Sequence, residues 1–367
     1  MSKVDGKTAR RALVIGRGSS GRAAEKALRE LGYETVDFID GYGMVVASPG
    51  VPVKSELQLG CERLKRRGTK LIAVTGSKGK SSVVKLVAEA LGGVPCGNYG
   101  LPVCDVGETG WAVVEVSSFQ LETTALSADT FEAAAILNLQ EDHLDRHGTA
   151  DVYHSLKRRL RTMAKASVEC AVGEGDRARF DALLKGSYFD NDILRSNGEM
   201  AAWLMEKAGL DAGAIAAAFA RFEPLPHRMN LVGEFGGVRF IDDSKATSLA
   251  ALAAGVTMAG RNVRLIAGGL PKGDDPFSVR EHLTNRVKKV YLIGTSAKVF
   301  AEAWSEAVDC EICGTMEAAV AGAISEAEKG DTVLLSPGTA SFDQFKSFGE
   351  RGDVFADLVI KQGKKDK

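Results

Sequence analysis

The most regular feature of the sequence is an alternation of short apolar runs with longer amphipathic segments. The apolar runs are expected to be buried strands, and they span residues 12–15, 71–74, 112–116, 134–139, 263–267, 290–293 and 332–335. Most of them end in glycine or in a polar loop. This alternation is typical of βαβ units, in which helices connect parallel strands that are buried on both faces. It predicts an α/β fold with mostly parallel sheets, whose ligands bind at the carboxyl ends of the strands.

Two breaks in this pattern divide the chain into three predicted domains, residues 1–68, 69–225 and 226–367. The first break is a basic run over 63–67, which lies before a new apolar run. The second contains Pro224 and Pro226, which end the amphipathic helix predicted over 211–222 because proline cannot continue a helix.

Composition narrows the class of protein. The 367 residues carry 47 Lys+Arg against 48 Asp+Glu, so the chain has no overall basic surface for nucleic acid or an anionic membrane. No apolar stretch approaches the about 18–20 residues of a membrane-spanning helix, and the start has no signal sequence. Six scattered cysteines favour free thiols in a reducing compartment, so we expect a cytoplasmic enzyme. Cys310 and Cys313 form a single CxxC, interpreted as two packed thiols rather than as a zinc or redox site.

The strongest chemical motif is the stretch 71–82, Leu-Ile-Ala-Val-Thr-Gly-Ser-Lys-Gly-Lys-Ser-Ser, which is followed by an amphipathic helix. A strand that leads through a glycine turn into a helix directs backbone N–H groups at a bound anion. Lys80 is placed to reach the outer phosphates of a nucleotide, and Ser81 is placed to bind Mg²⁺. The spacing differs from GxxxxGK[ST], because Val74 stands in place of the first glycine. The alternative is a lysine-bearing helix cap.

Polar residues also follow the next predicted strands. Glu115 ends one strand, where a second magnesium ligand is expected beside a phosphate loop. After the following strand, residues 138–147 contain two of the five histidines, His143 and His147, which favours a metal or phosphate site. The turn 16–21, Gly-Arg-Gly-Ser-Ser-Gly, is by itself a weak dinucleotide fingerprint.

Together these segments resemble the Mur ligases, ATP-dependent amide-forming enzymes of peptidoglycan precursor synthesis. The family's TGxxGK[ST] loop is present at 75–81, and further matching stretches are 115–122, 138–145, 225–228, 243–247 and 336–348. The stretches Ser-Ser-Phe-Gln-Leu-Glu (117–122) and Asp-Gln-Phe-Lys (343–346) resemble the member that adds D-glutamate. The order and spacing of the motifs hold from about residue 69 to 358.

The resemblance implies a Rossmann-like first domain for the UDP substrate, a central P-loop ATPase domain with a mostly parallel sheet, and a Rossmann-like third domain for the amino acid. The first domain is shorter than is usual in the family. The implied substrates are ATP, UDP-N-acetylmuramoyl-L-alanine and D-glutamate, with two Mg²⁺ ions and no nucleic-acid or membrane partner, and the protein is expected to be a monomer. The L-alanyl carboxylate attacks the γ-phosphate to give an acyl phosphate, and the D-glutamate amine then displaces phosphate.

The resemblance also assigns roles to individual residues. The catalytic residues that it implies are Lys80, His143 and Lys157. The magnesium ligands that it implies are Ser81, Glu115, His143 and a carbamylated Lys157. It places the nucleotide on Gly76, Ser77, Lys78, Gly79, Lys80, Ser81, Ser82, Asn197, Arg228 and Lys272. It places the UDP substrate on Gly18, Ser19, Ser20 and Asn98, and D-glutamate on Lys245, Ser341 and Phe348. Without the resemblance, Lys157 would be interpreted as one more charge on an exposed helix face.

Three other functions are considered. A related Mur or folylpolyglutamate-type ligase that uses another acid or amino acid is favoured by the shortened first domain. A nicotinamide-dependent oxidoreductase would use the turn 16–21 but leaves Lys80, Glu115 and His143 unexplained. A noncatalytic nucleotide-binding regulator would require altered catalytic positions, and those positions are intact here.

Overall fold

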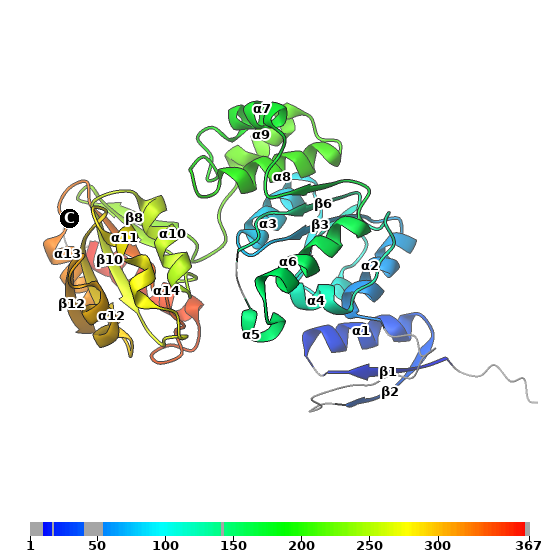
Figure 1. The fold of residues 1–367 in the computed structure, drawn as a ribbon, viewed down its shortest axis with the longest axis horizontal. Helices are drawn as coiled ribbons and strands as arrows, with labels where there is room; N and C mark the ends of the chain where they lie inside the picture. Colours follow the sequence, from blue (N-terminus) through cyan, green and yellow to red (C-terminus); the bar gives the residue numbers. More distant parts are fainter. Residues whose placement is uncertain (1–9, 17, 40–53, 141–142, 364–367) are drawn as a thin grey trace, which may run out of the picture. The chain divides into compact units, whose positions relative to one another are not determined.

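A computed structural model describes residues 10–16, 18–39, 54–140 and 143–363. The chain forms two compact units, residues 1–222 and 223–367, which are described separately (Figure 1). Both are built from sheets with helices on their faces, so the α/β class predicted from the sequence is confirmed.

The first unit contains a five-stranded parallel sheet in the order β4-β5-β3-β6-β7. The strands are β3 (Lys70–Thr75), β4 (Val94–Gly97), β5 (Trp111–Glu115), β6 (Ala133–Ile136) and β7 (Ser167–Glu169). Side chains of β3 alternate between two cores: Leu71 and Ala73 pack on one face, and Ile72 and Val74 on the other. Burial on both faces explains why this strand is a continuous apolar run in the sequence.

Helices cover both faces of this sheet. The face of Leu71 packs on α2 (Glu56–Arg66), α4 (Ser118–Thr123) and the 3₁₀ helices η1 (Val103–Asp105) and η2 (Arg159–Met163). The opposite face packs on α3 (Lys80–Ala90), α7 (Glu174–Leu184), α8 (Arg195–Lys207) and α9 (Ala212–Arg221). Two further helices, α5 (Leu144–His147) and α6 (Ala150–Arg158), follow β6 in the chain.

A small parallel sheet of β1 (Arg10–Ile15) and β2 (Tyr33–Ile39) belongs to the same unit, with α1 (Ser19–Glu30) as the crossover helix. Ala23 and Ala27 of α1 pack against Leu59 of α2 and Cys104 of η1. This small βαβ element therefore attaches to the larger sheet through helix–helix packing, as Figure 1 shows.

The second unit is built on a six-stranded sheet in the order β12-β11-β10-β13-β9-β8, in which only the β8–β9 pair is antiparallel among the described strands. Its strands are β8 (Asn230–Phe235), β9 (Val238–Asp242), β10 (Val263–Gly268), β11 (Val287–Ile293), β12 (Asp309–Gly314) and β13 (Thr332–Leu335). One face packs on α10 (Leu249–Ala259), η3 (Pro276–Val279), α11 (Arg280–Leu283) and α12 (Ala297–Trp304). The other face packs on α13 (Met316–Glu326) and α14 (Phe348–Gly363).

The strands predicted from apolar runs are confirmed, whereas β2, β4, β7, β8, β9 and β12 do not coincide with any of those runs. β12 is an edge strand with exposed charged residues, so it lacks the apolar run of a central strand. Cys310 and Cys313 of this strand pack into the cores on opposite faces of the sheet. Opposite placement prevents the two thiols from sharing a metal or forming a disulfide, and the interpretation as packed thiols is confirmed.

Among the described residues, every helix is too short or too polar to span a lipid bilayer.

Candidate active site

The phosphate loop has the strand–turn–helix geometry that the sequence predicts. β3 ends at Thr75, the loop runs over 76–79, and α3 begins at Lys80. The first N–H groups of a helix lack intrahelical partners, and together with the helix dipole they favour an anion. Lys80 lies over this loop, because its Nζ donates to the carbonyl oxygens of Gly76 at 2.8 Å and Ser77 at 3.1 Å.

Both the backbone conformation and the surroundings of Gly79 favour glycine at this position. Its φ of +82° is in the left-handed region, and a Cβ at this position would lie 2.2 Å from Nδ2 of Asn197. Asn197 is buried on α8. The structure therefore places the predicted adenine-contacting asparagine directly beside the phosphate loop.

A set of hydrogen bonds fixes the loop against the end of β6. The backbone N–H of Lys78 donates to Oδ1 of Asn138 at 2.8 Å, and Nδ2 of Asn138 donates to the Lys78 carbonyl at 3.0 Å. The hydroxyls of Ser77 and Tyr153 are 3.1 Å apart. Sequence reasoning missed Tyr153, although it lies one helical turn before Lys157 and therefore on the same face of α6.

Lys157 is only 2% exposed, so the interpretation of it as an exposed surface charge is wrong. Its Nζ donates to the Gly76 carbonyl at 3.0 Å and lies 4.5 Å from the centroid of the Tyr153 ring. Lys80 donates to the same carbonyl oxygen. Two lysine side chains thus converge on one atom of the phosphate loop, which favours binding of a highly charged anion.

Glu115 lies at the carboxyl end of β5, paired with Val74 of β3 and therefore next to the loop. It is 2% exposed, and its Oε1 accepts a hydrogen bond of 2.9 Å from Nδ2 of Asn98. Its Oε2 is buried and has no hydrogen-bond partner among the described residues. A buried carboxylate oxygen without a donor fits a cation, and the partly exposed Ser81 lies near the start of α3.

His143 is the N-cap of α5 and has a φ of +53°, which is unusual for a residue other than glycine. Its ring packs edge-on against Phe119 of α4, with ring centroids 5.0 Å apart. Glu141 and Asp142, which the sequence motif also includes, lie outside the described residues. Within the described ranges, no group of three or more His, Cys, Asp or Glu side chains is placed to hold a metal ion.

The predicted UDP-binding turn lies between β1 and α1. Gly16 has a φ of +98°, Gly18 is the N-cap of α1, and Ser19 and Ser20 are exposed in its first turn. Exposed N–H groups at the start of this 12-residue helix are suited to a diphosphate.

In the second unit, Lys245, Ser341 and Phe348 are grouped around Arg351. The Nζ of Lys245 lies 4.3 Å from the centroid of the Phe348 ring, and Ser341 is buried. Arg351 is fully buried and donates to the Ser244 carbonyl at 2.9 Å and to the Ala340 carbonyl at 3.2 Å. Arg351, which sequence reasoning missed, therefore joins the segment of Lys245 to the segment of Ser341.

The other second-unit candidates lie at the carboxyl ends of strands or nearby. Lys272 is exposed in the loop after β10. Arg228 has a buried Nε with no hydrogen-bond partner among the described residues. Asp243 accepts from the Ser336 hydroxyl at 2.9 Å, and burial raises the pKa of its carboxyl group to about 7.

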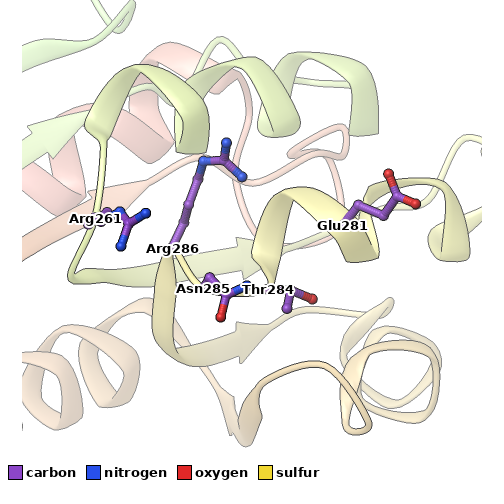
Figure 2. Close-up of a pocket in the computed structure, with 5 residues that line it drawn as sticks. All are labelled: Arg261, Glu281, Thr284, Asn285 and Arg286. Atoms are coloured by element: carbon purple, nitrogen blue, oxygen red, sulfur yellow. The ribbon is translucent and has the colours of Figure 1, made fainter.

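A separate hollow of about 240 Å³ lies at the amino ends of β10 and β11 and contains none of the predicted site residues. It is lined by Arg261, Glu281, Thr284, Asn285 and Arg286 (Figure 2). Ligands of open α/β sheets bind at the opposite, carboxyl ends of the strands, so this hollow is not the candidate site.

Comparison with known proteins finds Mur ligase domains in both units. Residues 74–235 match the Mur ligase middle domain, and residues 227–338 match the glutamate ligase domain of Mur ligases. A UDP-N-acetylmuramoylalanine–D-glutamate ligase of Methylobacillus flagellatus is 36% identical over 385 residues, which cover 88% of this chain and 84% of the relative. The enzyme of the same name from Acidobacterium capsulatum is 32% identical, with 96% of each chain covered.

The fold has a solved counterpart as well. A crystal structure of the MurF ligase from Thermotoga maritima in complex with ADP superimposes with a TM-score of 0.63 at 18% identity, covering 98% of this chain and 97% of that one.

Proposed function

The chain belongs to the Mur ligase family, and from this premise we propose that it is the ATP-dependent ligase that adds D-glutamate to UDP-N-acetylmuramoyl-L-alanine. The observation that carries the proposal is the phosphate loop on which Lys80 and Lys157 converge, beside the buried carboxylate of Glu115. Such a site suits phosphoryl transfer, in which the protein positions the reactants and neutralises charge.

The residues of the first unit act on ATP. The N–H groups at the start of α3 bind the phosphates, and Lys80 neutralises the charge that develops on the γ-phosphate. Ser81 and Glu115 would hold one Mg²⁺ and His143 a second, and bound Mg²⁺ supplies further neutralisation of the phosphate oxygens. The L-alanyl carboxylate oxygen forms a bond to the γ-phosphorus as the bond to ADP breaks, which gives the acyl phosphate.

The residues of the second unit bind the amino acid. Lys245 and Ser341 supply a cation and a hydroxyl, the groups that a dicarboxylic amino acid needs. The D-glutamate amine attacks the acyl carbonyl, phosphate leaves, and the amine proton is released. Arg228, Lys272 and Asn197 are assigned to the nucleotide, and Gly18, Ser19, Ser20 and Asn98 to the UDP substrate.

We further propose that Lys157 carries a carbamate in the active enzyme. Two ammonium groups on the Gly76 carbonyl oppose each other electrostatically. Loss of one proton from the Lys157 ammonium gives the neutral amine, and addition of CO₂ to this amine with loss of a second proton gives the carbamate anion. An anion at this place is able to bind Mg²⁺, whereas an ammonium group repels it.

The proposal includes the three-domain division at 68/69 and 225/226, with Rossmann-like first and third domains, and a monomeric state. The division, though not the monomeric state, is supported by two observations: β1 and β2 form a sheet of their own within residues 1–222, and residues 223–367 form a separate unit.

A phosphate-release assay tests the function. The full chain is incubated with ATP, Mg²⁺ and UDP-N-acetylmuramoyl-L-alanine, and with D-glutamate, L-glutamate or no amino acid. We expect sustained phosphate release only with D-glutamate, and a rate lower by about 100-fold or more from Lys80→Ala. Equal turnover with L-glutamate, or turnover only with another acid acceptor, would contradict the proposal and favour a related ligase.

A further inference from the structure

The Ser-Ser-Phe-Gln-Leu-Glu stretch forms α4 and the residue before it, and the proposed reaction gives this helix no role. Its two ends are firmly fixed. At the start, the Ser117 hydroxyl accepts from the Gln120 N–H at 3.2 Å, while Oε1 of Gln120 accepts from the Ser117 N–H at 2.9 Å. At the other end, Arg159 donates to the carbonyls of Glu122 at 3.1 Å and Thr124 at 3.0 Å. This short helix is therefore a rigid base for its side chains.

The side chains of α4 attach α5 to it. Oε2 of Glu122 accepts from Nη2 of Arg146 at 2.8 Å, and Oε1 of Glu122 lies 3.2 Å from Nδ1 of His147. Nε2 of His147 lies 3.0 Å from the Ser118 hydroxyl. The Glu122 carboxylate and the Ser118 hydroxyl therefore lie close to the two nitrogens of this buried ring. We call Glu122, Ser118 and His147 the α4–α5 clamp.

The clamp acts on the helix that begins at His143. α5 has only four residues, so its own hydrogen bonds do not suffice to form it in isolation. Its left-handed N-cap, His143, adds about 1–2 kcal/mol of backbone strain. His147 also donates its backbone N–H to the His143 carbonyl at 3.0 Å. The place of the His143 ring is therefore imposed by contacts outside α5, among which are the clamp, Phe119 of α4 and Tyr153 of α6.

We propose that Glu122 and His147 are positioning residues, which hold the His143 imidazole where it binds a divalent cation next to the reacting phosphate. The proposal rests on the proposed role of His143 in the ligase reaction. α4 starts directly after the strand that ends in Glu115, so one rigid helix sets the spacing between the two proposed metal-binding side chains. Positioning partners of this kind typically affect metal affinity by about 10- to 100-fold.

The test measures binding of Mn²⁺, in place of Mg²⁺, by electron paramagnetic resonance. The full chain is titrated in the presence of a nonhydrolysable ATP analogue and UDP-N-acetylmuramoyl-L-alanine. Glu122→Gln keeps the size of the side chain but removes its charge. We expect it to weaken the His143-dependent Mn²⁺ site about 10-fold. In a His143→Ala background the same substitution has no further effect on Mn²⁺ binding, because the clamp acts through His143.

Controls separate positioning from general destabilisation. Glu132→Gln breaks another carboxylate pair of the first unit, in which Lys165 donates to both oxygens at 2.7 Å, and it leaves Mn²⁺ binding unchanged. If Glu122→Gln does not fold, Ser118→Ala removes the other anchor of His147 and weakens the same Mn²⁺ site.

The possible failures are distinct. Wild-type Mn²⁺ binding by His143→Ala overturns both the proposed metal role of His143 and the clamp. Weakened binding by His143→Ala, together with unaffected Glu122→Gln or Ser118→Ala, overturns the clamp alone. The clamp is also overturned if Glu122→Gln weakens Mn²⁺ binding further in the His143→Ala background.

Discussion

Replacement of Gly79 by alanine tests the geometry of the phosphate loop directly. Two separate penalties follow from the structure. The φ of +82° costs a residue with a Cβ about 1–2 kcal/mol. The new methyl group would also lie 2.2 Å from Nδ2 of Asn197, and displacement of this buried amide adds about 1–3 kcal/mol.

Gly92 provides a matched control. It follows the same helix, α3, and has a φ of +60°, but a Cβ there would meet no atom within 4 Å. Gly92→Ala thus carries the backbone penalty without the clash. For a unit of this size, each kcal/mol lowers the unfolding midpoint by about 2–4 °C. We expect Gly79→Ala to lower the Tm clearly more than Gly92→Ala does.

Differential scanning calorimetry measures both variants, together with Asn197→Ala and Gly79→Ala/Asn197→Ala. Removal of the amide relieves the clash and leaves the backbone penalty. In the Asn197→Ala background, we therefore expect Gly79→Ala to lower the Tm only as much as Gly92→Ala lowers it in the wild type. ADP affinity, measured by calorimetric titration, falls in Gly79→Ala and not in Gly92→Ala. The described contact between the loop and α8 is wrong if Gly79→Ala and Gly92→Ala lower the Tm equally. It is also wrong if Gly79→Ala lowers the Tm as much in the Asn197→Ala background as in the wild type.

Four further predictions concern the reaction and its pH dependence. Lys80→Ala lowers kcat about 100-fold or more in the phosphate-release assay, because it removes charge neutralisation in the transition state, and activity within a few-fold of wild type would contradict its role. Lys157→Ala is nearly inactive and regains turnover with added short-chain carboxylates, which occupy the place of the carbamate; full activity without them would refute the carbamate. Lys245→Ala raises the KM for D-glutamate far more than the KM for ATP, and an equal rise in both would exclude specific recognition of glutamate. Burial raises the pKa of Asp243 from 3.8 to about 7, so its stabilising contribution is full below pH 3.8 and is lost as the pH rises through 7. The Tm of the wild type therefore falls between pH 4 and 8 more than the Tm of Asp243→Asn does, and parallel Tm curves would count against this assignment.

The parts of the fold that sequence predicts well are those with a local cause. Leu71–Val74 is apolar throughout because both faces of β3 are buried, and its exit into a glycine turn marks the phosphate loop. β12 was missed because an edge strand with exposed Asp309 and Glu311 carries no such run. Local patterns thus indicate central strands better than edge strands.

The site is harder to predict because much of it depends on contacts between distant segments. Lys157 is buried, and its hydrogen-bond partner Gly76 lies 81 residues away in the sequence. Only the family resemblance therefore identified Lys157 as a site residue in advance. The histidine-rich stretch after β6 indicated a site, but not that His143 faces Phe119 while His147 is held by Glu122. These assignments depend on the packing of α4 against α5, for which the sequence has no periodic signal.

The unpaired oxygen of Glu115 has a consequence for how long the enzyme survives. A buried polar atom without a hydrogen-bond partner lowers stability by about 1–3 kcal/mol, and more when it is charged. A cation that binds the folded unit and not the unfolded chain raises the unfolding free energy by RT ln(1 + [L]/Kd). Proteases attack the opened form, whose population falls as this free energy rises. A cell that runs short of magnesium nucleotide would then lose the enzyme itself to faster turnover, in addition to losing a substrate of its reaction.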